Sequence, residues 1–150
     1  MAKSSIAALV IIPCGQSKVW DKFPDRGPTP ARSAYTGGPF KVNMKYAERF
    51  GGTWLILSAR YGFVSPDFLI PGPYNVTFKM KKTKPIMIDT LRQQIVEQRL
   101  HSFDKIGGLG GKEYREAIEA AFSHFGKKVE FPFGGLNLFE AMRAISKAGQ

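Results

Sequence analysis

The sequence contains a single cysteine, two histidines and only 12 acidic residues in 150 positions. One thiol, Cys14, excludes an internal disulfide, and neither histidine stands at a metal-binding spacing from another ligand, so we expect no metal and no cofactor. No apolar run reaches the roughly 18 residues of a membrane span. The apolar stretch near the start is ended by Pro13 without a small-residue cleavage site, which predicts a core strand and not a signal peptide. These absences favour a cytoplasmic protein with no membrane partner.

Basic residues are abundant and unevenly distributed. The 22 lysines and arginines give a net charge of +10. Residues 1–84 hold 13 basic and 4 acidic residues, a net charge of +9, whereas residues 85–150 have a net charge of +1. A basic excess confined to one part of a chain is typical of proteins that bind a nucleotide, a nucleic acid or another phosphate-bearing partner. A protein that is simply basic and soluble is the alternative.

The order of apolar patterns predicts a single α/β domain over residues 1–150. Residues 6–12 form a continuous apolar run, as in a strand that is covered on both faces. Strands that alternate with helices indicate a three-layer sandwich, with a mostly parallel sheet of about four strands flanked by helices. The strands are expected at residues 6–12, 53–57, 105–109 and 129–131, the helices at 38–50 and 85–100, after Gly111 and after Asn137, and long loops at 20–36 and 63–84.

A short loop follows the first predicted strand, at the edge of the sheet where α/β proteins bind ligands. Gly15 and Ser17 allow backbone N–H groups to point at an anion, and Lys18 adds a positive charge. Ser17 is also a candidate catalytic group. Cys14 is a candidate ligand contact, but as a nucleophile it lacks an assigned base, and a small packed residue is the alternative.

The loop after the second predicted strand carries the stronger signal. Arg60 supplies a planar fork of donors for a phosphate or carboxylate, Tyr61 can stack on a base, and Gly62 permits a turn with positive φ. Ser58 and the nearby Asp67 are candidates to orient or activate a nucleophile. The alternative is a structural turn, with Arg60 in a salt bridge and Tyr61 in the core.

Other segments add candidate ligand contacts. Gly110 precedes a predicted helix, where missing side chains let an anion approach the N–H groups, and Lys112 adds charge there. A purely steric reason for the glycines is equally open. Tyr35, in the first long loop, is a second candidate to stack on a base. The lysines of residues 79–84 indicate either a solvated basic loop or a contact with a phosphate backbone.

These motifs resemble those of an uncharacterised family of bacterial and phage domains of unknown function. The shared motifs are Pro-Cys-x-x-x-Lys at residues 13–18, Ser-Ala-(Lys/Arg)-Tyr-Gly at residues 58–62, and Pro73-Tyr74. More distantly, the first motif is similar to the Pro-Cys-Ser-x-x-Lys-Pro-Tyr domain of archaeosine synthase, and the layout is similar to the YaaA group linked to DNA damage under peroxide stress. The resemblance implies chemistry around nucleobases or nucleic acids.

Three functional hypotheses remain open on the sequence. The first is an enzyme that acts on a nucleobase, a nucleoside, a nucleotide or a base in nucleic acid, by N-glycosidic bond or base-modification chemistry. In it, Arg60, Lys18 and Lys112 would hold phosphate or carbonyl oxygens. The second is a non-catalytic nucleic-acid-binding module that uses Lys79 and its neighbouring lysines. The third is a structural or accessory protein in which Arg60 and the glycines are structural.

Overall fold

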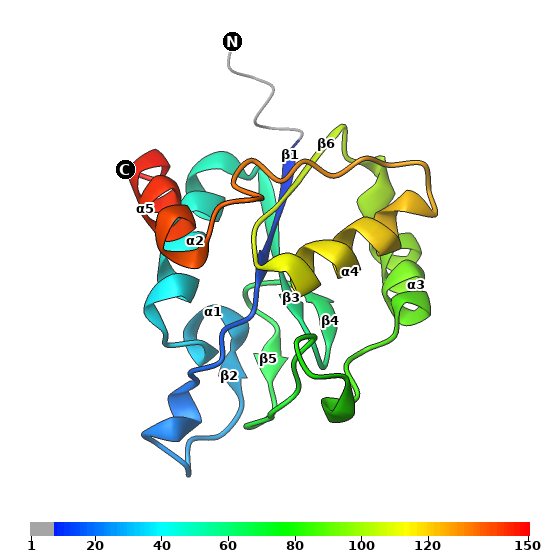
Figure 1. Cartoon of the computed structure of the whole chain (residues 1–150). Coiled ribbons are helices and arrows are strands. Elements are labelled where there is room, and N and C mark those ends of the chain that lie inside the picture. Colours follow the sequence, from blue (N-terminus) through cyan, green and yellow to red (C-terminus); the bar gives the residue numbers. More distant parts are fainter. Residues whose placement is uncertain (1–7) are drawn as a thin grey trace.

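The computed structural model describes residues 8–150 and contains a central four-stranded sheet (Figure 1). β1 lies between β3 and β6 and runs parallel to both, whereas β4 pairs with β3 in the antiparallel sense at one edge. The predicted mostly parallel sheet is therefore confirmed. Ile6 and Ala7, the start of the predicted first strand, lie outside the described residues. In spatial order the strands are β4 (Gly62–Val64), β3 (Thr53–Ser58), β1 (Ala8–Pro13) and β6 (Lys105–Gly108).

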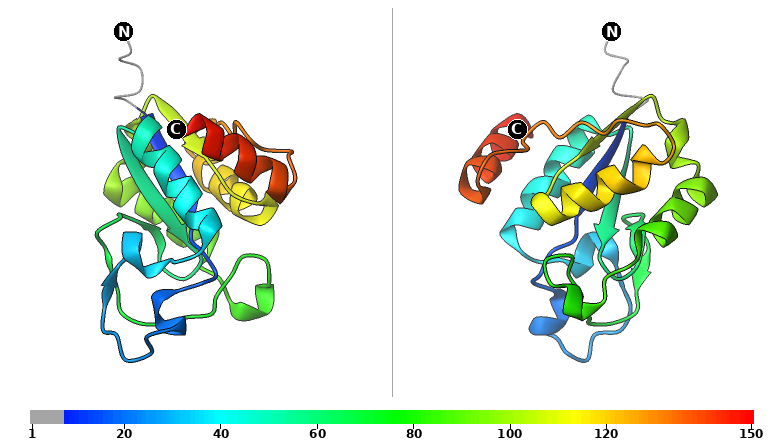
Figure 2. Two further views of the ribbon diagram at one scale, coloured as in Figure 1. Left: turned by 90° about the vertical axis from the view of Figure 1, so that its left-hand side faces the viewer. Right: turned by 45° about the vertical axis from the view of Figure 1, so that its right-hand side comes forward.

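Helices cover both faces of the sheet, which gives the predicted three layers. α3 and α4 lie together on one face, and α2 and α5 lie together on the other (Figure 1 and Figure 2). Within residues 8–150, no helix is both long and apolar enough to span a membrane. The α-helices are α1 (Ala31–Ala34), α2 (Gly38–Phe50), α3 (Ile88–Gln98), α4 (Lys112–Ser123) and α5 (Leu138–Ala148).

The apolar run of β1 follows from these two covered faces. Successive side chains of a strand point to opposite sides of the sheet. Leu9 and Ile11 accordingly belong to the core on the α3–α4 side, and Val10 and Ile12 to the core on the α2 side. All four side chains are buried. An alternating pattern would have left one face of the strand polar, so the run itself encodes the central position of β1.

Local signals in the sequence also define the helix starts. α2 begins at Gly38 with Pro39 in its first turn, where a missing N–H costs nothing. At the start of α5, the side chain of Asn137 accepts a hydrogen bond from the Glu140 N–H at 2.8 Å, and the Glu140 carboxylate accepts one from the Asn137 N–H at 3.3 Å. This capping box fixes where the last helix begins.

The prediction of a fourth strand at residues 129–131 is wrong. Glu130 forms only an isolated parallel bridge with Gly107. The chain then turns, because Pro132 has no N–H to extend the pairing and the Gly134 N–H donates to the Phe131 carbonyl at 3.0 Å. The fourth strand is instead β4, within a region expected to be a turn and a loop.

The carboxyl ends of β1, β3 and β6 meet at one edge of the sheet, as their parallel order requires. The two long connections, residues 14–37 and 65–87, gather beyond this edge (Figure 1). They contain α1, a small antiparallel pair and two 3₁₀ turns, with a third 3₁₀ turn between α3 and β6. The pair is β2 (Thr29–Pro30) and β5 (Leu69–Ile70), and the turns are η2 (Val19–Asp21), η3 (Lys81–Thr83) and η4 (Leu100–Ser102).

Candidate functional site

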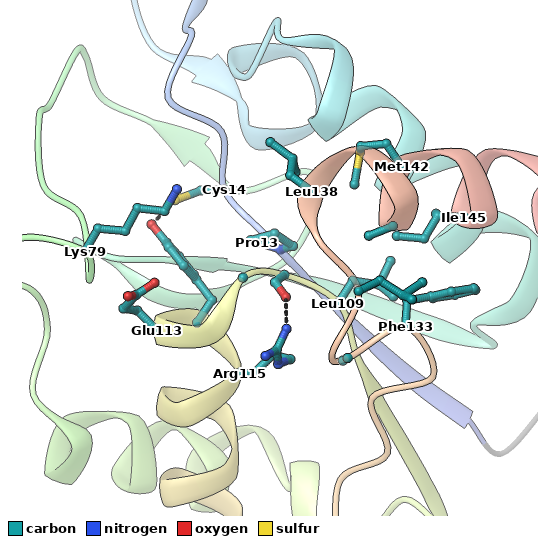
Figure 3. Close-up of a pocket in the computed structure, with 17 residues that line it drawn as sticks. Pro13, Cys14, Lys79, Leu109, Glu113, Arg115, Phe133, Leu138, Met142 and Ile145 are labelled. Carbon is teal, nitrogen blue, oxygen red and sulfur yellow. Dashed lines mark hydrogen bonds between the residues drawn. The ribbon is translucent and has the colours of Figure 1, made fainter.

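A pocket of about 290 Å³ lies between α4, α5 and the end of β1. Figure 3 shows Cys14, Lys79 and Glu113 on one side of it and Phe133 and Met142 on the other. The side of the pocket next to α5 is lined by apolar residues, whereas the side next to α4 is lined by both polar and apolar residues. The apolar side consists of Phe133, Leu136, Leu138, Met142 and Ile145, and the mixed side includes Pro13, Cys14, Lys79, Glu113, Tyr114 and Arg115.

Cys14 is held at the boundary of this pocket by the backbone of the neighbouring strand. Its N–H donates to the Leu57 carbonyl at 3.0 Å, which continues the β1–β3 pairing one residue past β1. Its sulfur lies 3.5 Å from the hydroxyl of Tyr114, within hydrogen-bond reach for sulfur. A thiol and a phenol are therefore neighbours at the carboxyl edge of the sheet.

Tyr114 stands in the first turn of α4 and is almost fully buried. Its ring meets the ring of Phe78 edge to face, with centroids 5.0 Å apart. Burial raises the pKa of the Tyr114 hydroxyl above its ordinary value, and the neighbouring Cys14 acts in the same direction. The hydroxyl therefore keeps its proton and can donate a hydrogen bond to a group in the pocket.

A second hollow of about 200 Å³ adjoins the pocket and shares Cys14, Lys79 and Tyr114 with it. Lys18 lines this hollow and is only 8% exposed. Its ammonium donates to the Gln16 carbonyl at 3.1 Å and lies 4.5 Å from the centre of the Tyr74 ring. Burial lowers the pKa of Lys18, while Cys14 and Asp21 oppose this shift.

Behind Lys18, three buried hydroxyl groups form a chain. Tyr74 exchanges hydrogen bonds with Tyr35 and, at 3.0 Å, with Ser58. The Ser58 oxygen also accepts the N–H groups of Arg60 and Tyr61 at 3.2 and 3.0 Å. Burial raises the pKa of both Tyr35 and Tyr74 above the ordinary value. The chain ties the two long connections to the end of β3.

The structure brings some of the sequence-predicted residues together at the hollows. Gly15 and Lys18 line the 200 Å³ hollow, Gly110 lines the pocket, and Cys14 lines both. Gly110 has φ +128°, and a Cβ there would approach Tyr114 and Pro13 to 3.2–3.3 Å, so a steric requirement accompanies its place in the pocket.

Ser58, Tyr35 and Tyr61 support the site from inside the protein. Ser58 is fully buried and Tyr35 is 2% exposed, so neither side chain faces a ligand in this conformation. Tyr61 packs edge to face on Tyr74, with ring centroids 5.6 Å apart. These residues hold the loops. Of the structural alternative for this turn, Tyr61 packs against the core, whereas Arg60 forms no salt bridge among residues 8–150.

Gly62 has φ +82°, and a Cβ there would overlap the side-chain amide of Gln94. That amide accepts the Phe63 N–H at 2.8 Å and donates to the Tyr61 carbonyl at 2.9 Å. Gly62 is therefore required for the turn into β4 and for its attachment to α3.

The other predicted site residues line neither the pocket nor the 200 Å³ hollow. Arg60 and Lys112 are exposed, and the Arg60 guanidinium lies 5.4 Å from the centre of the Tyr61 ring. Asp67 is an exposed partner of Arg32 at 3.3 Å. Ser17 is exposed, and its carbonyl accepts the Thr36 N–H at 3.0 Å. The structure thus separates the three predicted catalytic residues Ser17, Ser58 and Asp67 from the pocket.

Comparison with known proteins places the chain in a family. Residues 9–147 match the family described as "Family of unknown function (DUF6884)". The chain belongs to DUF6884. It is also 41% identical, over 112 residues, to the "Uncharacterized protein YfjM" of Bacillus subtilis (strain 168), an alignment that covers 75% of each chain. No solved structure matches it.

Two residues that line the pocket, Glu113 and Tyr114, are not among the candidates that the sequence predicts. Their place in the first turn of a helix that starts at the sheet edge was the available signal, because the first turn of such a helix faces the neighbouring strand ends. Within residues 8–150, no three His, Cys, Asp or Glu side chains gather as a metal site would require.

Proposed function

We propose that this protein is an enzyme that binds the base of a nucleoside, a nucleotide or a nucleic acid in the α4–α5 pocket and cleaves or exchanges its N-glycosidic bond. The observation that carries the proposal is the Cys14–Tyr114 pair. A nucleophile and a proton donor lie 3.5 Å apart, between an apolar pocket and a lysine-lined hollow.

The pocket suits a flat, largely apolar ring with polar edges. Small-molecule sites occupy roughly 300–1,000 Å³ and combine apolar surfaces with a few polar groups. At about 290 Å³ this pocket stands at the lower end, which favours a ring the size of a base over a larger cofactor. Phe133 and Met142 offer an apolar face, and Glu113 and Arg115 offer polar atoms for the ring edge.

The proposed reaction has two steps. The Cys14 sulfur attacks C1′ of the sugar and the C1′–N bond breaks, while the departing base takes the phenolic proton of Tyr114 and the thiol proton of Cys14 replaces it on the phenol oxygen, 3.5 Å away. Water, or a second base in an exchange reaction, then attacks C1′ and the C1′–S bond breaks. The proton of the attacking group passes to the phenol oxygen as the phenol's own proton passes to the departing sulfur, so the thiol and the phenol are both restored. Glu113 supplies a negative charge near the cationic sugar of the transition state.

Charge distribution and motif resemblance also support a nucleotide-like substrate. The smaller hollow is lined mainly by the basic N-terminal portion of the chain, including Lys18 and Lys79. The resemblance of residues 13–18 to a domain of archaeosine synthase is in keeping with a nucleobase as the reacting group.

Free base released from nucleosides, nucleoside monophosphates and oligonucleotides, measured by chromatography and mass spectrometry, tests this function. We expect Cys14→Ala to abolish release while the affinity for the substrate stays within a few-fold of wild type. We also expect an acid-quenched wild-type reaction to contain a glycosylated protein, with the sugar on the single cysteine. Cys14→Ser, which keeps the size but weakens the nucleophile, is the matched control and should retain a small residual rate. Unchanged base release by Cys14→Ala would contradict the proposal.

One observation favours a second candidate function, a non-catalytic nucleic-acid-binding module. Lys79, Lys81 and Lys82 are exposed, and within residues 8–150 none of them pairs with a carboxylate. Thr83 stabilises their turn by accepting the Thr77 N–H at 3.1 Å. This candidate predicts oligonucleotide binding that weakens steeply with salt, depends on these lysines, and persists in Cys14→Ala without any base release. Oligonucleotide binding that is insensitive to salt and to these lysines would exclude it.

A further inference from the structure

Lys18 is a buried cation without a matching anion in the described protein. Its side chain is 8% exposed, and among residues 8–150 no carboxylate lies within ion-pair distance of its ammonium. Burying an unpaired charge is expensive, so such groups are normally paired or bind a ligand. The nearby Asp21 carboxylate is engaged by the backbone N–H of Lys18, at 2.9 Å.

The contacts of the Lys18 ammonium are incomplete. Lysine has three donors, and the Gln16 carbonyl takes one of them at 3.1 Å. The faces of the Tyr74 and Tyr35 rings, with centroids at 4.5 and 6.0 Å, provide weaker stabilisation. At least one donor of the ammonium therefore has no protein acceptor among residues 8–150.

The hollow beside Lys18 has the composition of an anion site. Lys18 and Lys79 both line it, together with the polar residues Gln16, Asn75 and Thr77, and neither Asp nor Glu is among its lining residues. No hydrogen bond within residues 8–150 uses the backbone N–H of Gly15 or Gln16. Two lysines and three uncharged polar residues thus line one space of about 200 Å³.

Lys79 is held near this space by local structure. The Thr77 side chain accepts the Lys79 N–H at 3.2 Å, and Phe78 between them packs on Tyr114. Figure 3 shows the Lys79 side chain extending toward Cys14. The second lysine of the hollow therefore does not depend on a freely moving loop for its position.

We propose that the Lys18–Lys79 hollow is a phosphate subsite, so that the substrate is a phosphorylated nucleoside and not a free base or nucleoside. This inference rests on the proposed function, because the base would occupy the adjoining pocket while its phosphate occupies the hollow. Cys14, which lines both spaces, then faces the sugar that connects them. The phosphate belongs either to a mononucleotide or to one unit of a polynucleotide.

Titration calorimetry with four probes tests the subsite: a nucleoside, its 5′-monophosphate, an oligonucleotide containing it, and inorganic phosphate. We expect the monophosphate to bind about 10- to 100-fold more tightly than the nucleoside, the range expected for one hydrogen bond to a charged group. Lys18→Met should bring this ratio close to one and leave the nucleoside affinity unchanged. The matched control, Lys41→Met on the exposed side of α2, should preserve the ratio. Lys79→Met is the second variant if Lys18→Met does not fold, and it should lower the ratio as well.

The outcomes separate the subsite from the proposed function. Equal binding of nucleoside and monophosphate by the wild-type protein would overturn the subsite and leave the base pocket intact. If none of the nucleosides, nucleotides and oligonucleotides binds, the proposed function fails. Inorganic phosphate then tests the subsite separately. Phosphate binding that Lys18→Met abolishes supports the subsite, and an absence of phosphate binding overturns it. Tighter binding of the oligonucleotide than of the monophosphate identifies a polynucleotide as the source of the phosphate.

Discussion

The sulfur of Cys14 lies 3.5 Å from the hydroxyl of Tyr114, although 100 positions separate the two residues in the chain. The contact forms because β1 and β6 are adjacent parallel strands, so the loop after β1 and the helix after β6 start at the same edge. In the proposed reaction, Cys14 attacks and Tyr114 protonates the departing base.

Tyr114→Phe removes only the proton donor, because the ring can keep its packing on Phe78. We expect kcat to fall by about 10²- to 10⁴-fold, the usual contribution of general acid catalysis, with little change in substrate affinity. Steady-state kinetics and calorimetry on the same variant measure the two quantities separately. Tyr46→Phe, on the other side of the sheet, is the control. A Tyr114→Phe enzyme with wild-type kcat would show that the phenol is not the acid.

Ser58→Ala tests whether this residue is structural or catalytic. Its oxygen accepts two backbone N–H groups and contacts Tyr74, all inside the protein. We expect a loss of about 1–3 kcal/mol in the free energy of unfolding, because buried donors lose their acceptor. Urea denaturation measures this, with the exposed Ser33→Ala as control. Lost turnover at unchanged stability would instead support the catalytic role predicted from the sequence.

Gly62→Ala should destabilise the protein at the turn into β4. The positive φ costs a residue with a Cβ about 1–3 kcal/mol, and the methyl group would displace the Gln94 amide from its two hydrogen bonds. Gly72→Ala is the matched control, since a Cβ there has nothing within 4 Å. Thermal unfolding compares the two variants. Equal melting temperatures would contradict the role assigned to this turn.

Alkaline pH should unfold the protein through its buried tyrosines. Burial raises the pKa of Tyr35, Tyr74 and Tyr114 above the ordinary value of 10.0. The unfolded chain therefore loses these protons first, so their contribution to stability is complete below about pH 10 and is lost as the pH rises further.

The contribution of Lys18 to stability changes with pH in the opposite direction. Its lowered pKa means that the unfolded chain binds the proton more tightly, so stability rises with pH up to the ordinary lysine value of 10.5. Urea unfolding combined with phenolate absorbance across this range checks both effects. Ionisation of all five tyrosines near pH 10 in the folded protein would contradict the assignment.

The sequence predicts the framework well because its signals are local. The apolar run through Ile11 identifies a central strand, and Asn137 with Glu140 identifies a helix start. Parallel order then predicts that the loops after the strands meet. Residues 129–131 look like a strand by composition, but pairing also depends on Pro132 and the turn that follows.

The site was less predictable because side-chain direction depends on tertiary packing. Arg60 and Ser58 are two positions apart, yet one points into solvent and the other is fully buried. The sequence does not show that Lys18 lies over the Tyr74 ring, since the second long connection must fold back to bring them together. Cys14 directly follows a predicted strand, whereas its contact with Tyr114 depends on β1 and β6 being neighbours in the sheet.

A crystal structure of the protein with a nucleoside 5′-monophosphate tests the central claim most directly. The account predicts the base between Tyr114 and the apolar residues Phe133 and Met142, with C1′ roughly 3–3.5 Å from the Cys14 sulfur, the separation of reacting atoms poised for attack. A nucleotide bound instead at the exposed Arg60 side, or on the lysine turn with the pocket unoccupied, would contradict it.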